Sequence, residues 1–165
     1  MKLLKTVRAD PSDTFVFECA AEPGEWAISG AFAFAHLDLT ALTGKARAAF
    51  RAGFLGIESL GRSTLAQVVE VSDRERVEAT ELLCEQLVRT FGAPDVATAR
   101  SAAEEEIAFA AALSQHPAGM LVAVTRRYDN GETRESFRTL SPRPASGPLR
   151  VFALQEPHES DGSEQ

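Results

Sequence analysis

The sequence predicts an α+β domain in which a mostly antiparallel sheet carries an antiparallel helix pair on one face. Two observations lead to this prediction. Two apolar helical stripes, joined by a short linker, follow one another between residues 72 and 115. An Asn130-Gly131 turn then separates two runs with strand patterning, which predicts a hairpin. The predicted order of elements is β β β α β α α β β.

Three strands are expected in the first 35 residues. Residues 3–8 form the first, and a cluster of turn formers over residues 10–13 ends it. Residues 14–18 form the second. In residues 26–35 bulky and small residues alternate, which predicts a strand buried on both sides. We expect its alanine-rich side to meet the helix pair. A helix is the competing interpretation, but the aromatics recur at period 2 rather than 3.6.

The middle of the chain is expected to hold one helix and one strand. Residues 39–52 have a modest helical pattern, with Thr40 as the expected N-cap and Gly53 as the end. Residues 54–63 read as a connector rich in Gly and Ser. Residues 64–71 are predicted to form a strand because their apolar positions alternate.

The helix pair has the strongest end signals. Ser72 and Glu75 have the spacing of a capping box, in which each side chain bonds the other residue's amide. Gly92 and Pro94 end this first helix, and the second is expected over residues 95–115. The short linker predicts an antiparallel pair. Cys84 lies among leucines and is expected to be a buried thiol that acts as a small apolar residue.

The hairpin is predicted with its register. Strands over residues 120–128 and 132–140 flank the two-residue turn, and this loop length sets the pairing. The expected pairs are Asp129 with Glu132, Arg127 with Arg134, Arg126 with Glu135, and Val124 with Phe137. The face that holds Val122, Val124 and Phe137 is expected to be core.

The chain is expected to form one domain over residues 1–140, followed by a different segment. Residues 141–165 begin rich in proline, offer an apolar patch at residues 149–154, and end acidic. Low hydrophobicity and repeated acids predict that residues 156–165 are largely disordered.

Composition excludes several classes of protein. The chain has 165 residues, of which 44% are hydrophobic and 25% charged, as in an ordinary globular domain. A net charge of −7 argues against a nucleic-acid-binding protein. No apolar run reaches the roughly 18 residues of a membrane helix, and the N-terminus lacks a signal-peptide pattern. With only two cysteines, the chain has no disulfide framework, and we expect a cytoplasmic protein. From the charge and the short apolar runs, we expect neither a nucleic-acid partner nor a membrane partner.

A basic segment stands out in this acidic chain. Residues 126–150 carry a net charge of +3, whereas the whole chain carries −7. Arg126, Arg127, Arg134 and Arg138 are candidates for a patch that binds an anion or an acidic partner. The simpler interpretation is that these charges solvate an edge hairpin or accept the protein's own acidic end, and we favour it.

A second candidate site is a pocket near Trp26, His36 and Asp38. A histidine beside a carboxylate can serve acid–base chemistry or begin a metal site. A metal needs further ligands, and no spacing ties His36 to His116 or His158. We therefore predict no metal site, and a solvated strand end is the simpler interpretation of this pair.

Two other signals have simple interpretations. Residues 56–63 nearly match a phosphate-binding loop, but Arg62 replaces the lysine, and a strand rather than a helix follows. We interpret the segment as an ordinary connector and expect no cofactor. Glu104, Glu105 and Glu106 point about 100° apart on a helix, so they cannot converge on one ion.

Three segments carry a resemblance to a known family. They are residues 8–18, residues 21–34 and the run Glu105-Glu106-Ile107-Ala108-Phe109. Together they resemble a small family of uncharacterised bacterial proteins, and the resemblance covers most of residues 1–140. It implies a bacterial origin and a self-contained domain. It implies no activity and no catalytic residue.

The sequence does not identify a function. The favoured hypothesis is a non-enzymatic accessory or protein-interaction domain, because surface features are present without a chemical centre. It would dock a protein partner through the basic hairpin, an exposed aromatic face or the apolar patch at residues 149–154. The alternative is a small-molecule-binding protein or small enzyme with a pocket near Trp26, His36 and Asp38. A homodimer is a further hypothesis, because it would cover the aromatic face of residues 26–34.

Overall fold

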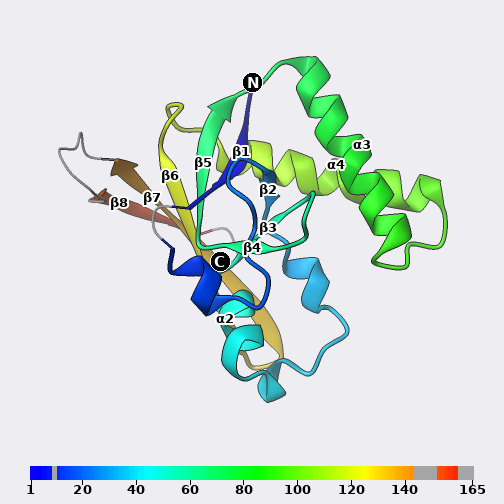
Figure 1. Cartoon of the computed structure of the whole chain (residues 1–165), viewed down its shortest axis with the longest axis horizontal. Helices are drawn as coiled ribbons and strands as arrows, with labels where there is room; N and C mark the ends of the chain where they lie inside the picture. The colour runs from blue at the N-terminus through cyan, green and yellow to red at the C-terminus, as the bar shows by residue number, and fades with distance from the viewer. Residues whose placement is uncertain (9–10, 143–151, 160–165) are drawn as a thin grey trace.

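The computed structural model describes residues 1–8, 11–142 and 152–159, the last range by its backbone alone. These residues form one antiparallel sheet of eight strands in the order β4-β3-β2-β1-β5-β6-β7-β8 (Figure 1). This confirms the predicted α+β class. The strands are β1 (Lys2–Val7), β2 (Trp26–Ile28), β3 (Phe54–Gly56), β4 (Arg62–Ser63), β5 (Leu65–Glu70), β6 (Leu121–Asp129), β7 (Glu132–Pro142) and β8 (Phe152–Glu159).

The predicted helix pair packs on this sheet. It consists of α3 (Asp73–Arg89) and α4 (Val96–Leu113), and α4 contacts β1 and β2. The capping box is present: Ser72 Oγ accepts from the Glu75 amide at 3.1 Å, and Glu75 Oε1 accepts from the Ser72 amide at 2.9 Å. The Asp95 carboxylate caps α4 by accepting from the Thr98 amide at 2.7 Å. Both helices therefore start where their side chains satisfy free amides.

The core lies between the helix pair and the sheet. It joins aliphatic residues of the central strands to one stripe from each helix, and Cys84 is buried there as predicted. The helix residues in this core are Ala79, Leu83, Cys84, Leu87, Ala99, Ala103, Ile107, Ala110 and Leu113. Burial of this apolar area is the main contribution to stability on this side of the molecule.

The predicted strand over residues 14–18 is wrong. The segment instead forms a single helical turn, α1 (Asp13–Val16). The Asp13 carboxylate is buried and accepts from the amide and hydroxyl of Thr64 at 3.2 and 3.0 Å. This bond holds the turn against the start of β5. Phe17 is buried and Phe15 is exposed, so the alternation that suggested a strand comes from a turn that buries one aromatic ring.

The long strand predicted for residues 26–35 is also wrong. Strand β2 ends at Ile28, and a 3₁₀ helix, η1 (Ala31–Phe34), follows. Gly30 lies between them with φ of +76°, and a Cβ there would lie 2.5 Å from Leu55 Cβ. The left-handed backbone at Gly30 ends the strand and turns the following aromatics in new directions.

The segment after η1 holds two helices instead of one. They are η2 (Leu39–Ala41) and α2 (Gly44–Ala52). Thr40 is not an N-cap: it donates to the Asp38 carboxylate from its amide at 3.1 Å and from its hydroxyl at 2.6 Å. The end of the helix at Gly53 is confirmed. The predicted connector over residues 54–63 is wrong, because it contains β3 and β4.

The hairpin is confirmed with the predicted register. Asp129 pairs with Glu132, Arg127 with Arg134, Arg126 with Glu135, and Val124 with Phe137. Strand β8 pairs with β7 beyond it. The predicted domain boundary at residue 140 stays a prediction. Much of the predicted tail, residues 143–151 and 160–165, lies outside the described residues.

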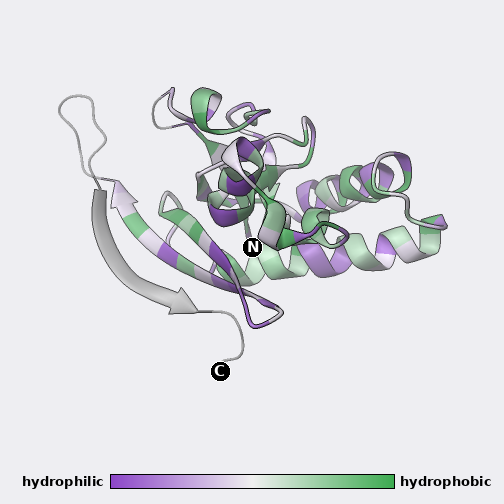
Figure 2. Ribbon diagram, turned by 90° about the horizontal axis from the view of Figure 1, so that it is seen from below, coloured by the Kyte–Doolittle hydropathy of each residue, from purple (hydrophilic) through white to green (hydrophobic). Residues whose placement is uncertain are grey.

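The hairpin extends well beyond its neighbour in the sheet. Strand β5 pairs with β6 only at Leu121, Val122 and Ala123. The rest of β6 instead packs against α2. Figure 1 shows the hairpin reaching down to α2, on the other side of the molecule from α3. Its turn is hydrophilic in Figure 2, in contrast to the green base of β6.

Candidate functional site

The inner face of the hairpin changes in character from its base to its tip. Side chains alternate along a strand, so Val122, Val124, Arg126 and Tyr128 of β6 share one face. The two valines are buried in the apolar core. Arg126 follows as a fully buried cation, and Tyr128 lies at the tip with 42% of its surface exposed. Along the inner face, the buried charge of Arg126 therefore lies between the apolar core and the exposed tip of the hairpin.

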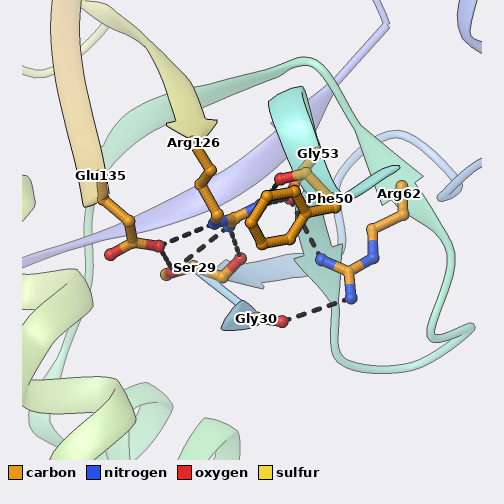
Figure 3. Close-up of polar contacts among 7 residues, drawn as sticks. All are labelled: Ser29, Gly30, Phe50, Gly53, Arg62, Arg126 and Glu135. Atoms are coloured by element: carbon orange, nitrogen blue, oxygen red, sulfur yellow. Dashed lines mark hydrogen bonds and ion pairs between the residues drawn. The ribbon is translucent and has the colours of Figure 1, made fainter. Parts of the chain in front are cut away.

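Arg126 is bonded through all three of its nitrogen atoms (Figure 3). Its Nε donates to Glu135 Oε2 at 2.7 Å. One terminal nitrogen donates to the carbonyls of Phe50 at 2.7 Å and Gly53 at 3.1 Å. The other donates to the carbonyl of Ser29 and, at 3.3 Å, to its hydroxyl. The Ser29 hydroxyl itself donates to Glu135 Oε2 at 2.7 Å. We call these residues the arginine clamp.

The arginine clamp joins three segments that are distant in the sequence. Phe50 and Gly53 lie at the end of α2, where helix carbonyls lack partners within the helix and favour a positive charge. Burial lowers the pKa of Arg126, against the raising effect of Glu135. An arginine still stays protonated at neutral pH. The clamp therefore fixes α2 against β6 and the end of β2.

A second buried arginine lies beside the clamp. Arg62 donates to the carbonyls of Gly53 at 3.1 Å and Gly30 at 3.3 Å, and its guanidinium lies 4.7 Å from the centre of the Phe34 ring. Burial, followed by repulsion from Arg126, lowers the pKa of Arg62 to about 9. In the described part of the chain no carboxylate forms an ion pair with Arg62. The interior here holds more positive than negative charge.

Glu106 of α4 has a pKa close to neutral pH. Its pKa is raised to about 7, first by burial, then by the charges of Glu135 and Glu105, while Arg126 opposes the shift. Helix α4 thus places a partly protonated carboxyl group where it interacts with the charges of Arg126 and Glu135 in the clamp. Of the three consecutive glutamates, Glu104 and Glu105 are exposed and Glu106 is half-buried.

A cleft of about 400 Å³ lies between α2 and β6. We call it the arginine cleft. Its lining consists of Leu39, Thr40, Leu42, Arg47, Phe50, Arg51, Arg126, Arg127 and Tyr128. Arg47 and Arg51 are four residues apart, so they lie on the same side of α2. Neither has an ion pair or a side-chain hydrogen bond within residues 1–8 and 11–142, and no acidic residue belongs to the lining.

A neighbouring cleft of about 440 Å³ is lined mainly by aromatic and aliphatic residues, and we call it the aromatic cleft. Its lining consists of Ala31, Phe32, Phe34, Ala35, Leu37, Leu39, Phe50, Tyr128, Gly131 and Thr133. Leu39, Phe50 and Tyr128 line both clefts. The two clefts are therefore adjacent, with cations on one side of the shared residues and aromatic rings on the other.

A third cleft, of about 660 Å³, lies at the far end of the sheet. Met1, Lys2, Arg76 and His116 belong to its lining. Its cations are already engaged: Lys2 Nζ donates to the His116 carbonyl at 2.7 Å, and Arg76 contacts the Met1 sulfur at 3.7 Å. This cleft offers less free positive charge than the arginine cleft.

The predicted pocket residues Trp26, His36 and Asp38 line none of these three clefts. Trp26 lies on β2 beneath Lys5, whose Nζ is 4.5 Å from the ring centre. His36 is exposed. Hydrogen bonds from Thr40 lower the pKa of Asp38, which begins η2. A pocket at these three residues stays a prediction.

The four arginines of the predicted patch do not share one surface. Arg126 is in the interior, whereas Arg127 and Arg138 are exposed. Arg134 lies opposite Arg127 and forms an ion pair with Glu132 at 3.5 Å. Alternation along the strands puts Arg127, Arg134 and Arg138 on the outer face of the hairpin. A role for these three in binding an anion or partner stays a prediction.

The loop that resembles a phosphate-binding motif is occupied by the protein's own carboxylate. Glu25 is buried and accepts from the amides of Glu58 at 3.0 Å and Ser59 at 2.8 Å, and from the Ser59 hydroxyl at 2.6 Å. It also accepts from the Glu22 amide at 2.7 Å. The amides that could hold a phosphate therefore hold Glu25, which fixes this loop to the start of β2.

Sequence reasoning missed the residues that define the clefts. Residues 39–53 contain Lys45, Arg47 and Arg51 and no acid, a signal that was visible in the sequence. The burial of Arg62 had no local signal, because its partners are carbonyls of distant segments. For Arg126 the strand alternation with Val122 and Val124 was a signal, but its carbonyl partners lie in distant segments. Among the described residues no three His, Cys, Asp or Glu side chains are placed to hold a metal ion, and no helix is long and apolar enough to cross a membrane.

Fold and clefts together describe an α+β domain with a curled antiparallel sheet and an internal arginine clamp. The chain belongs to a family of unknown function, DUF6505, which matches residues 1–159. This confirms the resemblance to an uncharacterised family and extends it beyond residue 140. No curated protein and no solved structure matches the chain.

Proposed function

We propose that this domain binds an organic anion in the arginine cleft, as a non-enzymatic binding or accessory domain. The observation that supports it is the lining itself, in which Arg47 and Arg51 have no acidic neighbour. Guanidinium groups bind phosphate and carboxylate with two parallel hydrogen bonds. An anionic head group bound to these two arginines would supply the hydrogen-bond partners that they lack within the described residues.

The spacing of Arg47 and Arg51 is unfavourable for folding, although Arg51 itself lies in the last turn of α2, where a cation is favoured. Like charges four residues apart on a helix repel one another, which destabilises α2 slightly. Residues 39–53 carry +3 while the chain carries −7, so the acidic residues of this protein lie elsewhere. A bound anion removes this repulsion, because it lies between the two cations.

The buried charges strengthen the attraction for an anion. Arg62 lies over the Phe34 ring and Arg126 bonds the Phe50 carbonyl, and of these two arginines only Arg126 is paired with Glu135. Charges inside a protein are screened less than charges in water. The interior therefore adds a positive field to that of the exposed arginines.

The chemistry of the lining favours binding over catalysis. The arginine cleft is lined by arginine, threonine, tyrosine and apolar residues. A general base at neutral pH is most often a histidine or a carboxyl group, and neither belongs to this lining. The cytoplasmic location and bacterial origin expected from the sequence form part of the proposal.

A protein partner is the second candidate for this site. Leu37 and Tyr128 are exposed by 51% and 42% at the aromatic cleft, and tyrosine is enriched among the residues that anchor protein interfaces. An acidic segment with an apolar side chain would fit both clefts. The homodimer suggested by the sequence stays a separate hypothesis.

Isothermal titration with inorganic phosphate and pyrophosphate tests the proposal. We expect Arg47→Gln/Arg51→Gln to weaken binding by about tenfold or more, because hydrogen bonds to charged groups contribute about 1.5–3 kcal/mol each. The control is Lys45→Gln, which removes one exposed charge from the same helix outside both linings.

The control should bind within about twofold of the wild type, since a remote surface charge is largely screened. Thermal melts of all variants check that α2 stays folded. Equal weakening by the control would show a diffuse attraction instead of a site, and unchanged binding by the double variant would reject the arginine cleft.

A further inference from the structure

The two adjacent clefts differ in the residues that line them. The arginine cleft offers cations, and the aromatic cleft offers Phe32, Phe34 and Leu37. Leu39, Phe50 and Tyr128 form the boundary that both share. A molecule that lies across this boundary contacts charge at one end and apolar surface at the other.

We propose that the ligand is an amphipathic organic phosphate or carboxylate bound as a single molecule. Its anionic head lies on Arg47 and Arg51, and its alkyl or aryl part lies in the aromatic cleft. This inference rests on the proposed function and names the class of ligand. Each cleft falls within the size range of small-molecule sites, at about 400 and 440 Å³.

The walls of the aromatic cleft are fixed by contacts behind them. Phe32 packs edge-on against Phe91 of the segment after α3, with ring centres 5.1 Å apart. Phe34 packs edge-on against Phe50 at 5.3 Å. Arg62 lies over the Phe34 ring. These rings do not need to be ordered when a ligand arrives, which lowers the entropic cost of binding.

The exposed apolar residues at the rim support an apolar ligand part. Leu37 is 51% exposed and Tyr128 is 42% exposed, and both line the aromatic cleft. Covering them removes apolar surface from water, which contributes about 25 cal/mol per Å². The anionic head alone would leave this surface uncovered.

The shape favours a single molecule over a membrane surface. Both apolar and cationic residues line concave clefts between α2, η1 and the hairpin. A membrane-binding helix would instead expose a continuous apolar stripe beside its cations. On α2 the large apolar residue, Phe50, is buried against the clamp.

A series of alkyl phosphates tests the inference by isothermal titration. Methyl, butyl and octyl phosphate are compared with the full chain, each below the concentration at which it forms micelles. We expect affinity to rise about two- to fourfold for each methylene that enters the aromatic cleft, with fourfold as the value for full burial.

Two variants locate the apolar part. Leu37→Ser removes one exposed apolar wall, and Ala35→Phe places a ring in the cleft. Both should flatten the rise from methyl to octyl phosphate while methyl phosphate binds as before. Val77→Ser is the control, because Val77 is 58% exposed on α3 and lines neither cleft.

Each outcome separates the two claims. If all three phosphates bind equally, the proposed anion site stands and the amphipathic ligand is rejected. If none binds, the proposed function itself fails. A rise that Leu37→Ser and Ala35→Phe leave unchanged places the chain elsewhere and rejects the inference. Co-sedimentation with phosphatidylglycerol vesicles but not phosphatidylcholine vesicles, without a rise for the soluble series, would identify a lipid surface instead and also reject it.

Discussion

The helix pair and the hairpin–α2 side of the molecule are held together by different forces. Helices α3 and α4 pack through apolar stripes, and their outer surface carries most of the acids of residues 73–115. On the other side, the contact of α2 with β6 depends on Arg126 and the carbonyls of Phe50 and Gly53. Apolar packing tolerates some change in any one residue, whereas the clamp depends on a single side chain.

The difference explains where each kind of surface lies. The apolar stripes of the helix pair are buried in the core, and the third cleft lies outside them, where Lys2 of β1, Arg76 of α3 and Ala111 of α4 belong to its lining. The arginine clamp holds α2 by its last turn only, which leaves Arg47, Phe50 and Arg51 beside open space. The candidate site is a consequence of polar anchoring.

The largest expected effect comes from breaking the clamp. Arg126→Met should lower the free energy of unfolding by about 3–5 kcal/mol, because it leaves Glu135 and several carbonyls without their buried donor. Urea denaturation followed by circular dichroism measures this change.

The matched change on the other side is Leu83→Ala, for which a loss of about 2–5 kcal/mol is expected from the cavity it leaves.

The double variant Arg126→Met/Glu135→Met should recover part of the stability that Arg126→Met loses, since no charge is then left unpaired. A double variant less stable than Arg126→Met would show that the ion pair is not what makes the single change costly.

Glu106 of α4 lies within the influence of charges on the hairpin side. Its substitution should change the free energy of unfolding by an intermediate amount that depends on pH. Its pKa is raised from the ordinary 4.5 to about 7 in the folded chain. The folded state therefore binds more protons than the unfolded state between these values, and stability falls as pH rises through this window. Glu106→Gln should flatten this fall and increase stability at pH 8 by about 1–2 kcal/mol, allowing for partial exposure.

Unfolding measured between pH 4.5 and 8 tests this expectation. Carboxyls whose pKa is lowered, such as Glu81 beside Arg100, act in the opposite direction and at lower pH. Their stabilisation is lost as pH falls below the ordinary carboxyl range, so the two contributions are separable. An unchanged slope in Glu106→Gln would mean that another group causes it.

The smallest expected effect concerns the start of α3. Ser72→Ala removes the side-chain cap from the Glu75 amide and should lower the free energy of unfolding by about 1 kcal/mol. Thr98→Ala is a useful control, because Asp95 caps α4 through the backbone amide of Thr98, which this change keeps. If Ser72→Ala lowers the free energy of unfolding no more than Thr98→Ala does, the capping box does not stabilise α3.

The sequence predicted those elements whose signals are local. The capping box at Ser72, the end of the helix at Gly53 and the register around Asn130-Gly131 each depend on neighbouring residues, and all three are confirmed. The prediction for residues 26–35 failed because Gly30 has a left-handed backbone, and it lies so close to Leu55, a residue 25 positions later, that a Cβ would not fit there.

The clefts lay beyond local signals for the same reason. Arg126 was expected on the surface as part of a basic hairpin, but carbonyls of α2 and β2 hold it inside. Nothing near Arg126 in the sequence specifies those partners. The cations of α2 could be seen in the sequence. That two of them line a cleft depends on which side of α2 the arginine clamp leaves uncovered.

The most direct test of the central claim is NMR of the arginine side chains during a titration with octyl phosphate. The Nε–Hε signals of Arg47 and Arg51 should shift together and saturate, while that of Arg76 in the third cleft stays in place. This result would place the anion between α2 and β6. Saturating shifts at Arg76, with Arg47 and Arg51 unchanged, would contradict the account and move the site to the other end of the sheet.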